Sequence, residues 1–110
     1  MTNEDKRISK LESLGTDALM QECVRIARKL KPKGSPAVEV EIAFCGPDQF
    51  SAAVRHDGFD VVNSYYRGLY HGHCATPQRA LATAVVMLRD KAKGYGIVIT
   101  RKRSRVQPTA

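Results

Sequence analysis

The run 71–74, His-Gly-His-Cys, is the chain's closest cluster of side chains that could bind a metal ion or act as a nucleophile. On a strand, His71 and His73 would point to the same face, as two ligands of one metal ion must. A closed zinc site needs four ligands, usually in paired spacing. The other candidates, His56, Cys45 and Cys23, belong to separate predicted elements. Cys74 would point away from His73, so the two do not form a thiol–imidazole pair. We therefore expect no metal, no cofactor and no enzymatic activity.

The same stretch leads into a predicted helix whose first turn could bind an anion. Thr76 is a favourable N-cap and Pro77 a favourable first residue, and a helix start exposes unpaired N–H groups. Gly72 would let a ligand approach the backbone, and His71, His73 and Arg79 could add donors. No phosphate-loop or dinucleotide motif accompanies these residues, so ordinary capping explains them equally well.

A group of tyrosines, interleaved with an arginine, forms the strongest candidate for recognition. Aromatic rings alternating with Arg on a sheet are typical of base stacking and of protein-interaction hot spots. Alternation along a strand would turn two of the rings toward the core. The predicted partner-binding residues are Tyr65, Tyr66, Arg67 and Tyr70.

Positive charge is concentrated in two short segments of this 110-residue chain, which has 18 Lys and Arg against 11 Asp and Glu and a net charge of +7. One cluster lies within 25–33, where cations at a helix C-terminus also offset the macrodipole. The second predicts a nucleic-acid contact, because clustered cations attract phosphate by counterion release. The residues of this second cluster are Arg101, Lys102, Arg103 and Arg105. Nucleic acid or a nucleoprotein complex is the expected partner.

The periodicity of apolar residues predicts the elements that position these side chains. Spacings of three and four indicate helices over 5–14, 17–31 and 76–94. Alternation indicates a strand over 38–45 and a second from Phe50, joined at Asp57-Gly58 to a third run over 59–73. We prefer one long strand for that third run, bulged at Gly68, although a helix capped by Asp60 also fits its spacing. A last short strand is expected over 95–100.

This order predicts an α+β two-layer sandwich, with a three- to four-stranded antiparallel sheet packed by helices in the order α-α-β-β-β-α-β. We expect a single domain over 1–100 and a basic tail over 101–110. The polar N-terminus lacks a signal-peptide pattern, and three widely spaced cysteines suit reduced thiols, so a cytoplasmic protein is expected. No apolar run is long enough to cross a membrane. An uncovered edge strand could pair across a two-fold axis, which would give a homodimer.

Two families resemble the chain. The order helix, three strands, helix is similar to a double-stranded-RNA-binding domain, but 77–80 (Pro-Gln-Arg-Ala) and 46–49 (Gly-Pro-Asp-Gln) depart from its phosphate-contact motifs. Residues 37–93, with a hairpin running into "GHCATPQRALATAV", resemble small phage- or prophage-encoded α+β proteins, including phage sandwich-type domains and anti-CRISPR-like inhibitors. This second resemblance implies stoichiometric binding without catalysis. The expected function is a phage-type accessory protein that binds nucleic acid or a nucleoprotein machine. The alternative is an anti-defence inhibitor or adaptor that docks on a host protein through the sheet face.

Overall fold

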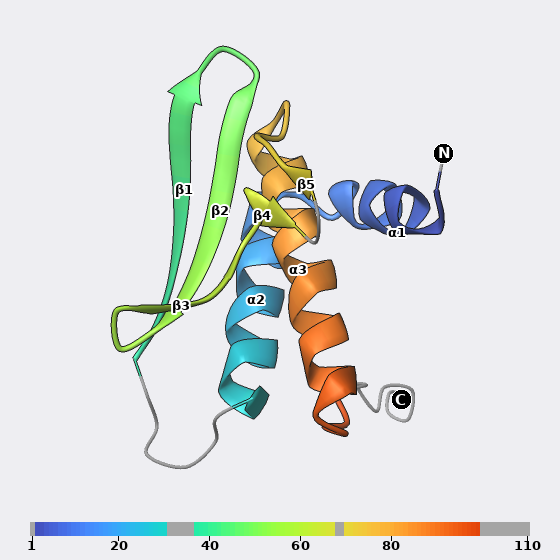
Figure 1. The fold of residues 1–110 in the computed structure, drawn as a ribbon, viewed down its shortest axis with the longest axis vertical. Helices are drawn as coiled ribbons and strands as arrows, with labels where there is room; N and C mark the ends of the chain where they lie inside the picture. Colours follow the sequence, from blue (N-terminus) through green and yellow to red (C-terminus); the bar gives the residue numbers. More distant parts are fainter. Residues whose placement is uncertain (1, 31–36, 68–69, 100–110) are drawn as a thin grey trace, which may run out of the picture.

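Three helices and a three-stranded sheet make up most of the structure, a computed structural model that describes residues 2–30, 37–67 and 70–99. The elements are α1 (Asn3–Glu12), α2 (Thr16–Leu30), β1 (Val38–Gly46), β2 (Gln49–His56), β3 (Phe59–Asn63), β4 (Tyr66–Arg67), β5 (Tyr70–His71) and α3 (Pro77–Gly94). In Figure 1, α2 and α3 run side by side along the sheet, and α1 lies against α3 on the side away from it. The predicted α+β class is confirmed.

The helices begin where side chains satisfy free backbone N–H groups. Thr2 and Asp5 form a capping box, in which the Thr2 hydroxyl accepts from the Asp5 amide and the Asp5 carboxylate accepts from the Thr2 amide. This pair starts α1 two residues before the predicted position. At α3, the Thr76 hydroxyl accepts from the Arg79 amide at 3.1 Å, and Pro77 occupies the first turn. Gly15, with φ of +85°, separates α1 from α2.

The sheet is antiparallel in the order β1-β2-β3, so β2 is central. Val40 faces Val54 and Ile42 faces Ala52 across β1 and β2. The turn between β2 and β3 has φ of +50° at Asp57 and +88° at Gly58, as the predicted Asp-Gly hairpin requires. The β1–β2 hairpin is long and reaches past the helices in Figure 1. Its tip therefore has little cover from the helical layer.

The core lies between the sheet and the α2–α3 pair. The predicted inward stripes are confirmed, since Leu19, Ile26, Leu81 and Leu88 are fully buried. The sheet contributes smaller side chains, Ala52, Val54 and Val62. His56 is also buried, and its Nε2 lies 2.8 Å from the Ala27 carbonyl, which ties the end of β2 to α2. This buried ring thus has a backbone hydrogen-bond partner.

The single long strand predicted over 59–73 is wrong. β3 ends at Asn63, whose side-chain oxygen accepts a hydrogen bond from the Tyr65 amide at 3.0 Å and turns the chain. The Ser64 hydroxyl accepts from the Ala52 amide at 2.8 Å, in the place of a ladder carbonyl. After this turn, β4 and β5 form a separate two-stranded sheet. The helix alternative is wrong as well, and the bulge expected at Gly68 lies outside the described residues.

The strand predicted over 95–100 is absent from 95–99, and residue 100 lies outside the described part. The helix closes with backbone bonds from the Tyr95 and Ile97 amides to the Ala92 carbonyl. Gly96 takes φ of +72°, which reverses the chain direction. The last described residues pack along the helices, so their alternating pattern reflects a partly buried coil. The predicted tail, 101–110, also lies outside the described residues.

No helix of the described residues combines the length and apolar character needed to cross a membrane.

Candidate functional site

The surplus charge lies almost wholly in segments that adjoin the described part of the chain. All 11 acidic residues are described, together with 12 of the 18 cations, so the described body is close to neutral. The other six cations are Lys31, Lys33, Arg101, Lys102, Arg103 and Arg105. These two segments therefore supply almost all of the chain's net positive charge, which favours attraction of phosphate.

Ion pairs engage most arginines of the described body. Arg55, for example, binds Glu41 at 2.9 Å and Asp60 at 2.8 Å on the outer face of the sheet. Across the described ranges, the arginine without an ion pair to an acidic side chain is Arg28. Arg28 and its neighbour Lys29 are exposed in the last turn of α2. We call this pair the α2 basic end.

A hydrogen bond holds the C-terminal coil against α2. The Arg25 Nη1 donates to the Ile99 carbonyl at 2.7 Å, across 74 positions of sequence. Ile99 therefore lies beside α2, one turn before the α2 basic end. The predicted nucleic-acid-binding residues begin at Arg101, two residues later, within about 7 Å of chain. In sequence, the first basic cluster continues past Leu30 with Lys31 and Lys33.

Arg25 is held in place by a buried carboxylate. Glu22 is only 8% exposed, and its two oxygens accept from Arg25 Nη2 at 2.6 Å and Nε at 3.0 Å. Arg89 of α3 approaches the same carboxylate at 3.4 Å. The hydrogen bond to Glu22 raises the pKa of Arg25 above its already high ordinary value. The guanidinium is thus a fixed cation that links α2 to the C-terminal coil.

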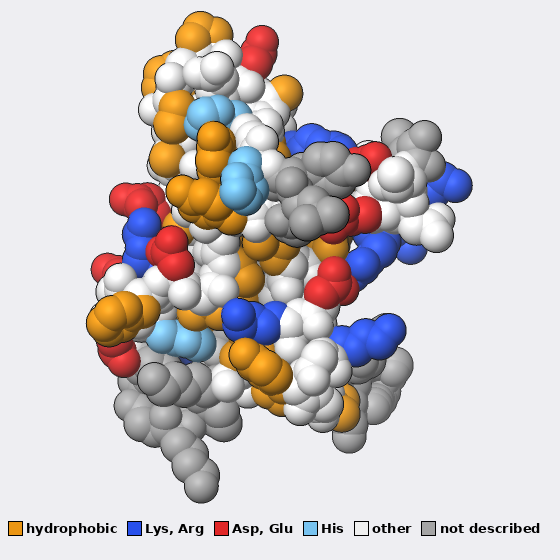
Figure 2. Space-filling model, viewed as in Figure 1, with side chains coloured by type: hydrophobic (Ala, Val, Ile, Leu, Met, Phe, Trp, Pro, Cys, Tyr) orange, Lys and Arg blue, Asp and Glu red, His pale blue; other side chains and the backbone are white. Residues whose placement is uncertain are grey.

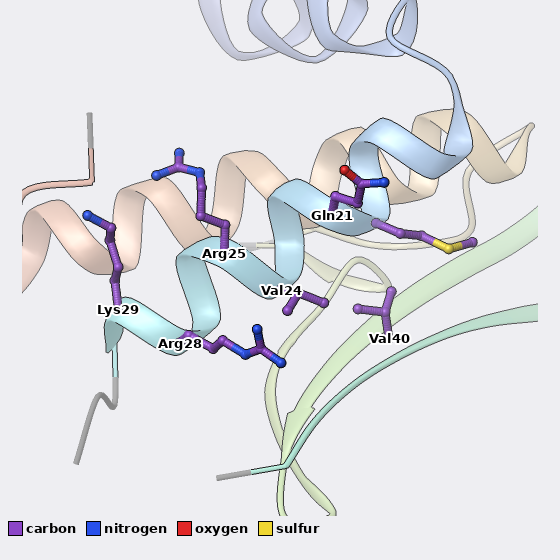
Figure 3. A pocket seen from close by; sticks show the side chains of 7 residues that line it. Gln21, Val24, Arg25, Arg28, Lys29 and Val40 are labelled. Atoms are coloured by element: carbon purple, nitrogen blue, oxygen red, sulfur yellow. The ribbon is translucent and has the colours of Figure 1, made fainter. Parts of the chain in front are cut away.

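A pocket of about 680 Å³ opens between α2 and β1 beside the α2 basic end. Figure 3 shows Val24 and Val40 facing each other across it, with Arg28 extending from α2 toward the strand. Met20 completes the apolar part of the wall. The pocket is therefore apolar in its interior and cationic toward the C-terminal end of α2.

The predicted tyrosine surface is displaced from the three-stranded sheet to the β4–β5 pair. The Tyr65 and Tyr66 rings meet edge to face at 5.0 Å. His73 lies 4.9 Å from the Tyr65 ring, and His71 lies 6.1 Å from it and 5.2 Å from Tyr66. These four residues form a cluster, here called the ring cluster, in which Tyr66 is 58% exposed. Figure 2 shows histidines beside hydrophobic side chains on this face of the molecule.

The cations near the ring cluster are engaged by α1. Arg67 lies 3.9 Å from Glu4, whereas Arg79 binds Glu12 at 2.8 Å and Asp5 at 3.3 Å. Arg79 therefore tethers α1 to α3 and does not supply the anion site considered from the sequence. The Tyr70 side chain lies outside what the structure describes.

A pocket of about 220 Å³ lies beside the ring cluster, lined in part by His71, His73 and Cys74. The described residues include no group of three His, Cys, Asp or Glu side chains that could hold a metal ion. The histidines that the sequence suggested as metal ligands instead pack against Tyr65.

The proximity of Arg25 to Ile99 could not be read from the sequence, because nothing in a pattern links residues 74 positions apart. The packing of His71 and His73 on Tyr65 was missed for a different reason, since it depends on the turn at Asn63.

No protein-family model matches the chain, and comparison with curated proteins and with solved structures gives no significant match. Function must therefore be argued from the residues themselves.

Proposed function

We propose that this is a phage-type accessory protein that binds nucleic acid stoichiometrically in the cytoplasm, without catalysis. The contact surface is the α2 basic end together with the cations that follow Leu30 and Ile99. The observation that supports the proposal is the Arg25–Ile99 hydrogen bond, which holds Ile99, two positions before Arg101, one turn from the α2 basic end.

Charge distribution supports this choice of surface. In the described body 12 cations meet 11 acids, and most arginines are in ion pairs that weaken their attraction for phosphate. Arg28 and Lys29 project from the helix end without such a pair to a described acid. Cations at a helix C-terminus also stabilise the helix. Stabilisation of the α2 C-terminus explains Arg28 and Lys29, but it does not explain the four further cations at 101–105.

A salt titration tests the proposal. Fluorescence polarisation with mixed-sequence single-stranded RNA, single-stranded DNA and duplex DNA would be measured at several salt concentrations. The variant Arg28→Gln/Lys29→Gln removes two cations from the proposed surface. For duplex DNA we expect its log–log salt slope to be less negative by up to about 1.8, and its affinity near 100 mM salt to fall roughly tenfold.

The matched control is Lys6→Gln/Lys10→Gln, which removes the same charge from two exposed positions on α1. We expect this control to bind almost as tightly as the unchanged chain. Equal losses in both variants would reject the α2 basic end as the site. Absence of salt-dependent binding to all three probes would reject nucleic-acid binding itself.

The ring cluster favours a second candidate, an inhibitor or adaptor that docks on a host protein. Tyr66 is largely exposed while its ring is held by Tyr65 and His71, so an aromatic anchor is presented at little entropic cost. This candidate predicts that a partner captured from host extract is lost with Tyr66→Ala and retained with Arg28→Gln/Lys29→Gln. The opposite pattern would support nucleic-acid binding and count against docking.

A further inference from the structure

Strand β1 has an open edge in the described part of the chain, where it pairs with β2 alone. The backbone of Phe50 exchanges hydrogen bonds of 2.8 and 2.7 Å with Cys74, on the side of β2 away from β1. On the same side, the Ala52 carbonyl accepts from the Ser64 amide, and the Ala52 amide donates to the Ser64 hydroxyl. Antiparallel pairs alternate between bonded and non-bonded, so the β1 residues opposite these two, Phe44 and Ile42, direct their N–H and C=O groups outward. The edge therefore offers regularly spaced donors and acceptors to another strand.

The same strand carries an exposed aromatic ring and one wall of an empty apolar pocket. Phe44 is 67% exposed near the tip of the hairpin, although its ring contacts Phe50 at a centroid distance of 5.4 Å. Four residues before it, Val40 lines the pocket between α2 and β1 with Met20 and Val24. Positions 40, 42 and 44 share one face of the strand, the face that packs on the helices. An exposed ring and a pocket that could receive it thus lie on one open edge.

We propose that two copies of the chain pair through their β1 edges, antiparallel and centred on Ile42, to form a continuous six-stranded sheet. Ile42 then faces Ile42 of the second copy, and Val40 faces Phe44 of the second copy. The two-fold axis makes this contact occur twice, so each copy inserts its Phe44 beside the other's pocket. Both helical layers stay on one face of the sheet, because the axis is perpendicular to it.

Charge selects this register over its neighbours. A pairing centred on Glu41 would set the two Glu41 carboxylates directly opposite each other, and one centred on Val40 would oppose Glu39 to Glu41. Like charges directly opposite are destabilising. Centring on Ile42 places Glu41 opposite Ala43 and Glu39 opposite Cys45. A pairing centred on Ala43 avoids the carboxylates as well, but it shortens the ladder and moves Phe44 away from the pocket.

The insertion also suits the cation at the rim of the pocket. Figure 3 shows Arg28 extending from α2 toward β1, and Arg28 and Val40 line the same pocket. The incoming Phe44 ring would lie near this guanidinium, whose attraction to an aromatic face favours the pair. The pairing does not depend on the proposed nucleic-acid function, since it rests on the β1 edge and the apolar pocket.

Sedimentation equilibrium on the full chain tests the dimer. We expect a concentration-dependent mass that approaches twice that of the chain. Phe44→Ser should raise the dissociation constant roughly tenfold or more, because it removes the inserted ring from both contacts. The matched control is Phe59→Ser, which changes a 77% exposed phenylalanine on β3 and should leave the dimer intact. A monomer at every accessible concentration, or equal weakening by the two variants, would overturn the proposal.

Cross-linking tests the register directly. In a Cys45→Ser background, two copies that carry Ile42→Cys should become joined by a disulfide between their position-42 side chains. The facing Cα atoms of a hydrogen-bonded pair are about 5.5 Å apart, within the range of about 4.4–6.8 Å that a disulfide needs. Glu41→Cys in the same background faces Ala43 and should cross-link far more slowly. Faster cross-linking of Glu41→Cys would overturn the pairing centred on Ile42.

Discussion

Replacing Arg25 by methionine should destabilise the fold and release the C-terminal coil from α2. The guanidinium donates two hydrogen bonds to the buried Glu22 carboxylate and a third to the Ile99 carbonyl. Methionine keeps an unbranched apolar stem of similar length but cannot donate a hydrogen bond. Arg25→Met therefore tests the polar contacts with little change in packing.

The expected magnitude follows from the burial of the two partners. Removing one member of a buried ion pair costs about 3–5 kcal/mol. Two features lower this figure here, because the Arg25 side chain is 23% exposed and Arg89 still lies 3.4 Å from the Glu22 carboxylate. We expect a loss of about 2–3 kcal/mol in the free energy of unfolding, which corresponds to a fall of roughly 8–20 °C in Tm for a domain of this size.

Urea unfolding followed by far-UV circular dichroism measures this loss as a fall in the midpoint at constant m-value. Arg7→Met is the matched control, because Arg7 pairs with Asp90 at 2.9 Å while both side chains are about half exposed, at 45% and 52%. Such exposed pairs contribute about 0–1 kcal/mol. Equal costs for the two variants would refute the argument that burial of Glu22 makes the Arg25 pair the stronger one.

Two further predictions concern titratable groups. Burial raises the pKa of Cys23 to about 12, whereas Cys45 is exposed, so a thiol reagent near pH 8 should label Cys45 in the folded protein and Cys23 only after unfolding. Mass spectrometry of labelled peptides measures this, and comparable native labelling of both would contradict the described burial. Hydrogen bonds from Thr2, assisted by the charge of Arg79, lower the pKa of Asp5. The ionised Asp5 carboxylate therefore contributes its full stabilisation above the ordinary aspartate pKa of about 3.9, and this contribution is lost as the pH falls through the lowered pKa of the folded state. Asp5→Asn should reduce the fall in the free energy of unfolding between about pH 5 and pH 2, the range of this titration, as measured by urea unfolding. An unchanged fall would show that Asp5 does not cause it.

The parts of the fold that sequence reasoning predicted are those with a local physical cause. The stripe of Leu19, Cys23 and Ile26 is buried on α2 as its spacing indicated. Thr76-Pro77 begins α3, and Asp57-Gly58 turns the hairpin, because capping and left-handed backbone depend on residues within a few positions. Such features need no knowledge of tertiary contacts.

The errors arose where one polar side chain overrode a favourable pattern. The run 59–73 is rich in residues that favour strands, but the Asn63 side chain captures the Tyr65 amide and the Ser64 hydroxyl captures the Ala52 amide. Residues 97–99 alternate like a strand, yet they lie beside α2, where Arg25 binds the Ile99 carbonyl. Whether a backbone group finds a ladder partner or a side chain is decided by tertiary structure.

In the candidate site, too, the features with a local cause were predicted and those that depend on distant contacts were not. Tyr65 and Tyr66 were predicted as recognition residues from composition, and the structure places both in one cluster. The two histidines that join them, and the hydrogen bond from Arg25 to Ile99, depend on contacts distant in sequence. The functional roles of all these residues stay predictions until the binding experiments are made.

The attachment of α1 has a consequence for hydrogen exchange. This helix has ten residues and buries only Ile8 and Leu11, and its polar ties to α3 are the contacts of Arg79 and the half-exposed Arg7–Asp90 pair. An isolated helix of that length is marginal in water. Its amides should therefore exchange through a local opening in which α1 detaches while α2, α3 and the sheet stay folded. The N-terminal helix would then be the least protected cooperative unit among the three helices.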